Sequence, residues 1–276
     1  MASNLVFHYC NVDTALSILN NKEIWMTSIR NMNDANESIG VYRMFFELLR
    51  KYDARNSLDA MYRLALTPGM IQLYENPSGA YPEYVTCFSA KSDLVSQWIS
   101  YADGGRGLAI GFDEEELSNI ASGSGGALEY QKITYVSEEN IQKHIPSIYR
   151  ELECCSRVDG MAIMDKAMEQ IKKIYPFGIR YKTIHYESEC ETRLVYRYGQ
   201  PSGTVRIPHD WEISSPRAYA KRNMINTYVS LHFPQTAIKK IMLGPQYQRN
   251  FHEIELALEA MNYTGLEIEQ SGSGYR

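Results

Sequence analysis

ESECETRLV, residues 187–195, joins an alternating strand pattern to a crowded set of carboxylates. Side chains alternate between the two faces of a strand, so Glu187, Glu189, Glu191 and Arg193 are predicted to share one face. Carboxylates two residues apart raise the pKa of at least one of them unless a cation or solvent relieves the repulsion. Two interpretations follow: a solvated edge strand, or a cleft of paired carboxylates with Arg193 among its counter-charges.

Strand and helix patterns follow one another irregularly along the rest of the chain. Strands are predicted at residues 5–9, 24–28, 85–89, 107–112, 128–136, 191–198, 224–232, 238–243 and 266–269. Helices are predicted after a cap at Asp13, at residues 38–52, 57–66, 92–102 and 248–261, and twice within 138–175. Strands dominate both halves and helices cluster between them, which predicts an α+β fold rather than βαβ alternation.

One domain is expected over residues 1–270, with a mobile Ser/Gly loop at 122–126 and a flexible tail at 271–276. Apolar strand patterns resume directly behind the loop, which argues against a domain boundary there. No glycine motif of a Rossmann or P-loop site opens a helix after a strand. Nucleotide binding of those two kinds is therefore not predicted.

Composition excludes several classes of protein. The 276 residues carry a net charge of −5, which argues against a protein that coats nucleic acid through a basic surface. No apolar run approaches the ~20 residues needed to cross a bilayer, and the first ten residues do not resemble a signal peptide. The five cysteines show no disulfide or metal spacing, so a cytoplasmic protein without membrane partners is expected.

Candidate polar groups lie on the first two predicted strands. His8 stands on the first strand, where a structural role is the more common explanation for a single histidine. Thr27 and Ser28 end the second strand and lead into a polar loop that contains Asn33 and Asp34. Such a strand end can line a polar pocket, and a plain turn is the alternative. The histidines show no ligand spacing, so no metal site is predicted.

The chain resembles a widespread bacterial family of unknown function over about residues 5–260. The family is marked by an HYT-type strand, an NDPFE-type loop, a CFS strand, a W-x-x-YA helix, a GF strand and a K-x(6)-E-x-E-x-R strand. The corresponding residues here are His8-Tyr9-Cys10, residues 33–37, Cys87-Phe88-Ser89, Trp98 with Tyr101-Ala102, Gly107 with Gly111-Phe112-Asp113, Lys182 with Glu189, Glu191 and Arg193, and the closing strand Ile238–Pro245. The chain departs from the pattern at Cys10, where Thr is usual, and at Ala35-Asn36, where Pro-Phe is usual.

That family in turn is similar to the ADP-ribosyltransferase superfamily, whose order of His, small hydroxyl and E-x-E matches His8, Thr27-Ser28 and Glu189-x-Glu191. The resemblance implies a split antiparallel β-sheet core with a cleft, flanked by helices. It implies NAD as cofactor, Glu191 as the carboxylate beside its ribose, and Glu189 on the acceptor side. The NAD-binding residues it implies are His8, which orients the dinucleotide, with Tyr9, Thr27, Ser28 and Arg193.

The expected function is therefore transfer of ADP-ribose by a bacterial toxin or anti-phage effector, which would have an antitoxin or inhibitor protein as a partner. RNA or single-stranded DNA is favoured over a protein as the acceptor, because Tyr219 lies between Arg217 and the pair Lys221-Arg222. A solvated basic loop is the alternative explanation of that cluster. The residues predicted to contact the acceptor are Asn33, Asp34, Tyr101, Lys221 and Arg222.

Two other functions remain open on the sequence. A binding module for nucleotide or nucleic acid would keep the fold without turnover, and an NAD glycohydrolase would use water as the acceptor. The series Glu187, Glu189 and Glu191 favours catalysis, because a binding module does not need crowded carboxylates. Label moving from NAD to a macromolecule, release of free ADP-ribose, or neither would separate the three functions.

Overall fold

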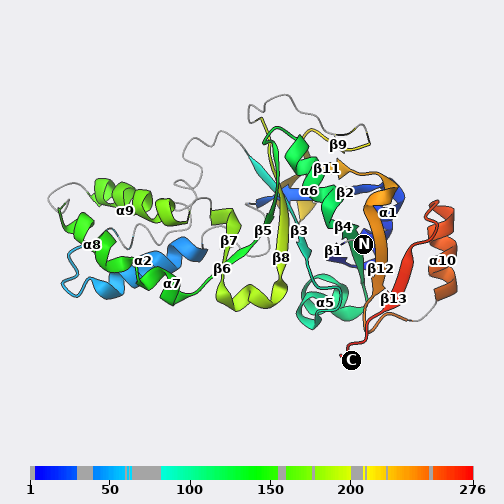
Figure 1. The fold of residues 1–276 in the computed structure, drawn as a ribbon, viewed down its shortest axis with the longest axis horizontal. Coiled ribbons are helices and arrows are strands. Elements are labelled where there is room, and N and C mark those ends of the chain that lie inside the picture. Colours follow the sequence, from blue (N-terminus) through cyan, green and yellow to red (C-terminus); the bar gives the residue numbers. More distant parts are fainter. Residues whose placement is uncertain are drawn as a thin grey trace. The chain divides into compact units, whose positions relative to one another are not determined.

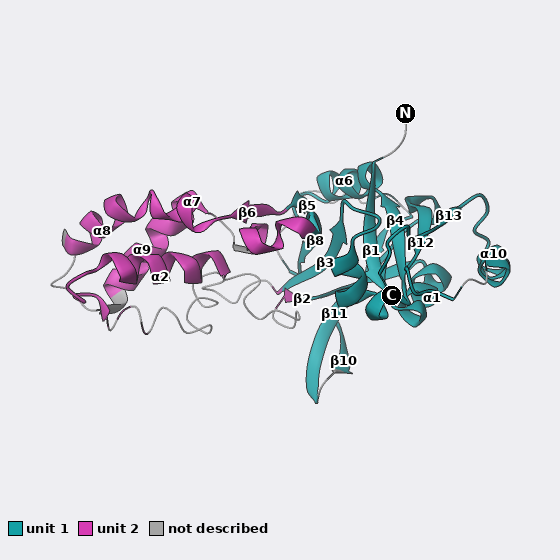
Figure 2. Ribbon diagram, turned by 90° about the horizontal axis from the view of Figure 1, so that it is seen from below, with its two compact units in different colours: residues 1–28, 83–132, 189–276 teal, residues 29–82, 133–188 magenta. Residues whose placement is uncertain are grey.

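The computed structural model describes residues 4–29, 40–59, 61, 63, 82–154, 160–175, 178–199, 208, 210–221, 223–248 and 251–275. The chain divides into two compact units (Figure 2). Unit 1 contains residues 1–28, 83–132 and 189–276, and unit 2 contains residues 29–82 and 133–188. Over the described residues, no helix has both the length and the apolar character that a membrane span requires.

Unit 1 is built on a mostly antiparallel sheet with helices beside it (Figure 1). One path through the sheet runs β10-β11-β2-β3-β1-β4-β12-β13, with β8 between β3 and β5 and with β9 beside β11; the β12–β13 pair is parallel. The strands are β1 (Leu5–Cys10), β2 (Glu23–Ser28), β3 (Glu83–Ser89), β4 (Leu108–Asp113), β5 (Leu128–Lys132), β8 (Glu191–Arg197), β9 (Glu212–Ile213), β10 (Arg217–Lys221), β11 (Met224–His232), β12 (Ile238–Leu243) and β13 (Glu267–Gln270). The predicted α+β class is confirmed.

The sheet forks at β3. β8 pairs with β3 along its whole length, from Glu83 to Ser89, and so occupies one edge of that strand. β2 and β1 must share the other edge. β2 pairs near the start of β3, at Tyr84 and Val85, whereas β1 pairs at its end, where Phe7 lies opposite Ser89. The two half-sheets on this side therefore separate along the middle of β3.

The two faces of the unit 1 sheet carry different side chains. Residues directly opposite in neighbouring strands point to the same face, and successive residues point to opposite faces. One face is apolar because Val6, Met26, Phe88, Ile110 and Leu194 alternate inward, and it forms the main core. The helices that accompany it are α1 (Val12–Asn21), α6 (Glu114–Gly123) and α10 (Phe251–Ala260).

We call the other face the Glu191 face, after its most notable charged residue. Near β1 and β4 it carries a smaller apolar cluster of Phe7, Tyr9 and Trp98, the last from α5 (Val95–Tyr101). Towards β3 and β8 it becomes polar. Unit 1 thus has one apolar face and one face on which buried charge is concentrated.

Unit 2 has its own core. Its elements are α2 (Gly40–Tyr52), β6 (Thr134–Val136), α7 (Glu138–Gln142), α8 (Ile145–Cys154), α9 (Gly160–Ile174), and β7 (Tyr181–Thr183) between the short 3-10 turns Gly178–Arg180 and Ile184–Glu189. α2 is amphipathic, and its apolar side, including Phe45 and Leu49, is fully buried in this core. Asp53, directly after the helix, accepts hydrogen bonds from the Leu58 amide and the Tyr149 hydroxyl, both at 2.8 Å.

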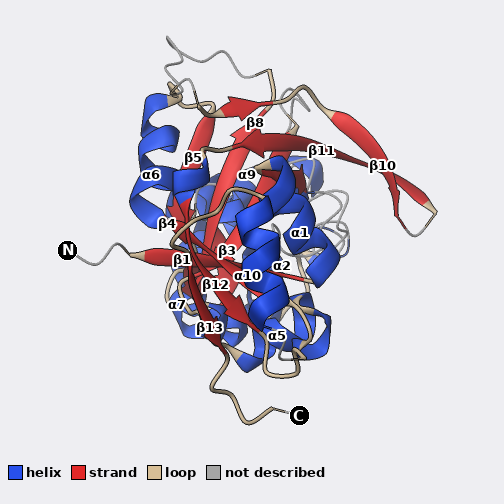
Figure 3. Cartoon of the chain, turned by 90° about the vertical axis from the view of Figure 1, so that its right-hand side faces the viewer, coloured by secondary structure: helices blue, strands red, loops and turns tan. Residues whose placement is uncertain are grey.

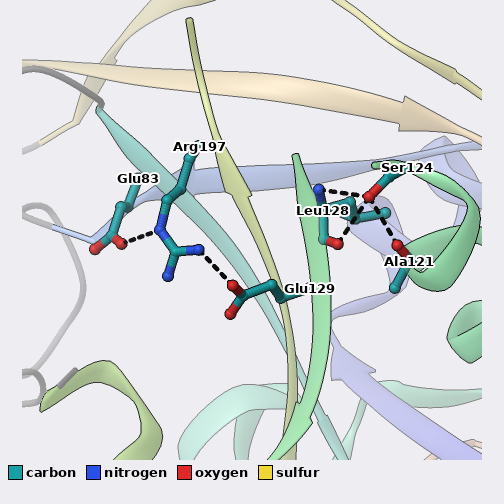
Figure 4. Close-up of polar contacts among 6 residues, drawn as sticks. All are labelled: Glu83, Ala121, Ser124, Leu128, Glu129 and Arg197. Carbon is teal, nitrogen blue, oxygen red and sulfur yellow. Dashed lines mark hydrogen bonds and ion pairs between the residues drawn. The ribbon is translucent and has the colours of Figure 1, made fainter. Parts of the chain in front are cut away.

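The predicted Ser/Gly loop is a tight turn at the end of α6. The hydroxyl of Ser124 is buried, and its one proton is shared between the carbonyls of Ala121 and Leu128, at 2.7 and 2.9 Å, while its oxygen accepts from the Leu128 amide at 2.9 Å (Figure 4). One hydroxyl therefore satisfies the helix end and the start of β5. The same figure shows Arg197 bound to Glu83 and Glu129 across three strands.

Several expected boundaries change in the structure. The N-cap of α1 is Asn11, which accepts from the Thr14 amide, rather than Asp13. The strand predicted at 128–136 is two strands, one in each unit, and the described residues of 138–175 form three helices rather than two. The helix predicted at 57–66 lies largely outside the described residues.

In the predicted flexible tail, Ser271 and Gly272 both donate to Asp93, and the expectation that residues 271–276 are flexible stays a prediction. The expectation of a single domain over 1–270 stays a prediction, because compact units and independent folding are different properties.

Candidate functional site

Glu191 and Arg193 form a buried ion pair on β8. They are two residues apart on a strand, so they share a face, and Arg193 is 0% exposed while Glu191 is 6% exposed. The Nε of Arg193 donates to Oε1 of Glu191 at 2.6 Å and Nη2 donates to Oε2 at 3.2 Å. This two-point contact fixes the orientation of the carboxylate and stabilises its charge. Glu191 is therefore a pre-positioned anion.

Glu187 and Glu189 do not share a strand face with Glu191, so that part of the prediction is wrong. They lie in the 3-10 turn Ile184–Glu189, and the strand begins only at Glu191. Cys190 separates the two segments with a φ of +46°, which is unusual for a residue with a side chain. The junction is tied to β3 because Ser89 donates to the Glu189 carbonyl at 2.6 Å.

His8 lies on the opposite face of the sheet from Glu191. Phe7 pairs with Ser89 and Ser89 pairs with Glu191, so Phe7 is on the Glu191 face and its neighbour His8 is not. The Nδ1 of His8 is 3.0 Å from the carbonyl of Cys87, at the middle of β3, where neither β1 nor β2 pairs with that edge of the strand. A carbonyl only accepts, so Nδ1 carries the proton. Burial lowers the pKa of His8.

The two hydroxyl candidates on β2 also separate. Thr27 pairs with Val85, which pairs with Val195, so Thr27 is on the Glu191 face. Ser28 points the other way and is buried. The prediction that His8, Ser28 and Glu191 converge on one cleft is therefore wrong. Order along the chain does not determine the face on which each residue lies, because the register between separate strands decides it.

Tyr9 is on the Glu191 face but has a structural role. Its hydroxyl donates to the Lys91 carbonyl at 2.8 Å and accepts from the Leu94 amide at 3.1 Å, and its ring packs edge-on against Trp98 at 4.6 Å. Burial raises the pKa of Tyr9. Tyr101 lies at the end of α5 and is exposed.

Four of the predicted acceptor residues lie wholly or partly outside the described residues. Asn33, Asp34 and Arg222 lie outside the described residues, and Lys221 is described only as the last residue of β10. The predicted basic cluster is therefore represented by Arg217, which is exposed at the start of the same strand.

Sequence reasoning missed an aromatic cluster that we call the aromatic platform, made of Trp25, Tyr219 and Tyr228. Trp25 stacks on Tyr228 with ring centroids 3.9 Å apart, and Tyr219 lies 5.6 Å from Trp25 and 5.7 Å from Tyr228. Alternation along each strand would have shown that these rings could share a face. It could not show that β2 and β10 flank β11.

Gln131 was also missed. It lies directly opposite Arg193 on β5, and both side-chain amide atoms are buried without a hydrogen-bond partner. The same face thus holds one fixed carboxylate, one guanidinium and one amide with hydrogen-bonding capacity to spare. Across the part of the chain that the structure describes, no group of three or more His, Cys, Asp or Glu residues is arranged to hold a metal ion.

Comparison with known proteins gives one match. A family model described as "Protein of unknown function (DUF2971)" matches residues 97–194, about a third of the chain. The match ends inside β8 and includes Glu191 and Arg193. No curated protein and no solved structure matches the chain. The expected resemblance to a family of unknown function is thus confirmed for this segment, and the relation to ADP-ribosyltransferases stays a prediction.

Proposed function

We propose that this chain transfers ADP-ribose from NAD to an acceptor, with Glu191 as the catalytic carboxylate. The observation that carries the proposal is the Glu191–Arg193 pair: a negative charge, oriented at both oxygens, beside the fork of an antiparallel sheet. A carboxylate that is already oriented can stabilise a positive charge developing next to it, with little rearrangement of the protein during the reaction. Arg193 is a positioning residue, since it is fully buried behind the carboxylate.

The chemistry needs one such anion. When the bond between C1′ of the ribose and the nicotinamide nitrogen breaks, the electron pair leaves with nicotinamide and the ribose becomes oxocarbenium-like. Glu191 would stabilise that charge. A nucleophilic oxygen or nitrogen of the acceptor then bonds to C1′, and its proton passes to the acceptor-side carboxylate or to water. Glu189, two residues earlier in the chain and the last residue of the 3-10 turn, remains the proposed acceptor-side carboxylate.

The fold is consistent with the proposal. A sheet whose two halves separate along β3 is what a split antiparallel core requires, and Glu191 lies on the strand at the other edge of β3. The proposal assigns the NAD contacts to the Glu191 face, where Thr27 also lies. His8 and Ser28 are removed from the site, and His8 instead closes the gap in the fork.

The test uses labelled NAD with cell RNA, DNA and protein as acceptors. Glu191→Asp keeps the charge but withdraws the carboxylate by one methylene, and Glu191→Gln removes the charge. Each should lower the rate by about 10²-fold or more, the range for losing a main electrostatic stabiliser. Glu187→Gln, in the exposed turn, is the matched control and should keep full activity.

Folding must be checked in parallel, because Glu191 also balances a buried cation. Glu191→Asp is the informative variant, since it keeps a negative charge next to the buried Arg193 guanidinium. A large loss of rate with a melting temperature near that of the wild type supports catalysis by Glu191. An Asp variant that turns over NAD at the wild-type rate would contradict it, and free ADP-ribose without labelled acceptor would indicate a glycohydrolase.

A second candidate is a binding module without turnover. It is favoured by one observation: both oxygens of Glu191 are engaged by Arg193 and little of the residue is exposed. Such a pair can stabilise the fold without taking part in catalysis. Wild-type protein that consumes no NAD with any acceptor, yet binds a nucleotide, would select this function over transfer.

A further inference from the structure

We propose that the aromatic platform of Trp25, Tyr219 and Tyr228, with Arg217 beside it, binds a single-stranded nucleic acid by stacking its bases. As the acceptor subsite of the transfer reaction this rests on the proposed function. As a binding surface it does not, because binding can be measured without NAD.

The platform is assembled from three neighbouring strands. Tyr228 on β11 lies opposite Arg217 on β10, and on its other side it lies opposite Thr27 of β2. Trp25 and Tyr219 stand two residues away from these positions, so all of them are on the Glu191 face. Figure 3 shows β10 and the adjoining end of β11 projecting beyond the rest of the sheet. A flexible single-stranded nucleic acid can therefore lie along the hairpin of β10 and β11.

Accessibility distinguishes the platform from ordinary sheet packing. Tyr228 is 8% exposed and acts as the base of the stack, whereas Trp25 lies on it and keeps 41% of its surface exposed. Tyr219 is partly exposed as well. A large ring held flat against another ring, with much of its surface in water, is the arrangement on which a nucleobase stacks.

The charge around the platform fits a phosphate backbone. The exposed Arg217 guanidinium is in the same cross-strand row as Tyr228. The nearest carboxylate on β2 is Glu23, and it is already occupied: it accepts from Nε1 of Trp25 at 3.3 Å and pairs with Nε2 of His232 at 3.1 Å. On β10, Arg217 and Tyr219 are two residues apart, so this cation and this ring are on the same face of the strand.

The platform is also close to the proposed catalytic carboxylate. Thr27 is level with Val195 across β3, so Trp25, two residues back, is level with Arg193. One strand lies between β2 and β8, which sets their separation on the order of 10 Å at that level, more where the fork opens. A base stacked on Trp25 would place the same nucleotide or its neighbour beside Glu191.

The binding experiment uses fluorescein-labelled 12-mers of U and dT and a 12-base-pair duplex, measured by fluorescence anisotropy over a salt series. We expect both single strands to bind more tightly than the duplex, and affinity to fall as salt rises. Trp25→Ala and Tyr219→Ala should each weaken binding by at least about fivefold, the lower end for one base stack. Arg217→Ala should weaken binding and flatten the salt dependence.

Tyr52→Ala is the matched control, because Tyr52 is similarly exposed but lies on α2 of unit 2. It should bind as the wild type does. Tighter binding of the U 12-mer than of the dT 12-mer would identify RNA as the ligand, and the reverse would identify single-stranded DNA. Unchanged affinity in both Trp25→Ala and Tyr219→Ala would overturn the proposal.

The outcomes also separate this inference from the proposed function. Binding that needs Trp25, without any transfer of label from NAD, supports the platform and refutes the transferase. Transfer to RNA or DNA that proceeds unchanged in Trp25→Ala supports the transferase and refutes the platform. Label that appears only on protein, together with no binding of either 12-mer, likewise overturns the platform.

Discussion

Replacing Arg193 by Met should destabilise the protein strongly. Met has similar length and no charge, so it fills much of the space but removes the guanidinium that binds both oxygens of the nearly buried Glu191 carboxylate. Two hydrogen bonds, at 2.6 and 3.2 Å, are lost at the same time. Removing one partner of a buried ion pair costs about 3–5 kcal/mol. For a domain of this size that corresponds to a fall in melting temperature of roughly 6–20 °C.

The double variant Arg193→Met with Glu191→Gln separates the effect of lost packing from the effect of removing one charge of the ion pair. An apolar or neutral pair in place of a buried ion pair is often close to neutral. The double variant should therefore recover most of the stability lost by Arg193→Met, with a coupling energy of about 2 kcal/mol or more between the two positions.

The assay is urea denaturation of the wild type, both single variants and the double variant, followed by far-ultraviolet circular dichroism at one pH and salt concentration. The four free energies of unfolding close a double-mutant cycle. A loss below about 1 kcal/mol for Arg193→Met, or strictly additive effects, would refute the argument that the pair is buried and mutually dependent.

Three further predictions concern positions outside the ion pair. Burial holds the pKa of His8 below 6.5, so as the pH falls below 6.5 only the unfolded chain gains that proton. The free energy of unfolding therefore drops by up to about 1.4 kcal/mol per pH unit until the pKa of the folded state is reached. His8→Gln should lessen this pH dependence in urea titrations between pH 7.5 and 5, and the same slope in variant and wild type would contradict it. Ser124→Ala should cost about 1–3 kcal/mol, since the Leu128 amide loses its acceptor, and a melting temperature equal to the wild type would disprove this. Gly244→Ala would place a Cβ 2.2 Å from the Gly105 carbonyl, so it should lower the melting temperature or the soluble yield, and a fully stable variant would show that the backbone moves apart freely.

Local patterns in the sequence were sufficient for most strands. β1, β2, β3, β4 and β8 were predicted to within two residues at each end, because each alternates or is continuously apolar between polar segments. The α+β class follows from their irregular order. β10 was missed, since its apolar residues are mostly small alanines that give no period.

Relations between strands were not predictable from the same patterns. The apolar segment 128–136 gave no sign that the chain leaves one sheet at Ile133 and enters another. The run of glutamates gave no sign that Cys190 turns the backbone and removes Glu187 and Glu189 from the strand. Whether His8 and Glu191 lie on the same face of the sheet depends on how β1 and β8 each pair with β3. The sequence of one strand does not contain that register.

The division of unit 2 between two insertions has a consequence for how the chain is made. One insertion lies between the paired strands β2 and β3 and the other between the paired strands β5 and β8. In each case more than fifty residues lie between the two strands that pair. Closing a loop of that length costs about 2 kcal/mol more in entropy than closing a short hairpin. During synthesis on the ribosome, unit 2 has all its parts once Ser188 has emerged, whereas unit 1 still lacks β8, β11 and β12. We therefore expect the inserted unit to be the first completed core, and the surrounding sheet to close last.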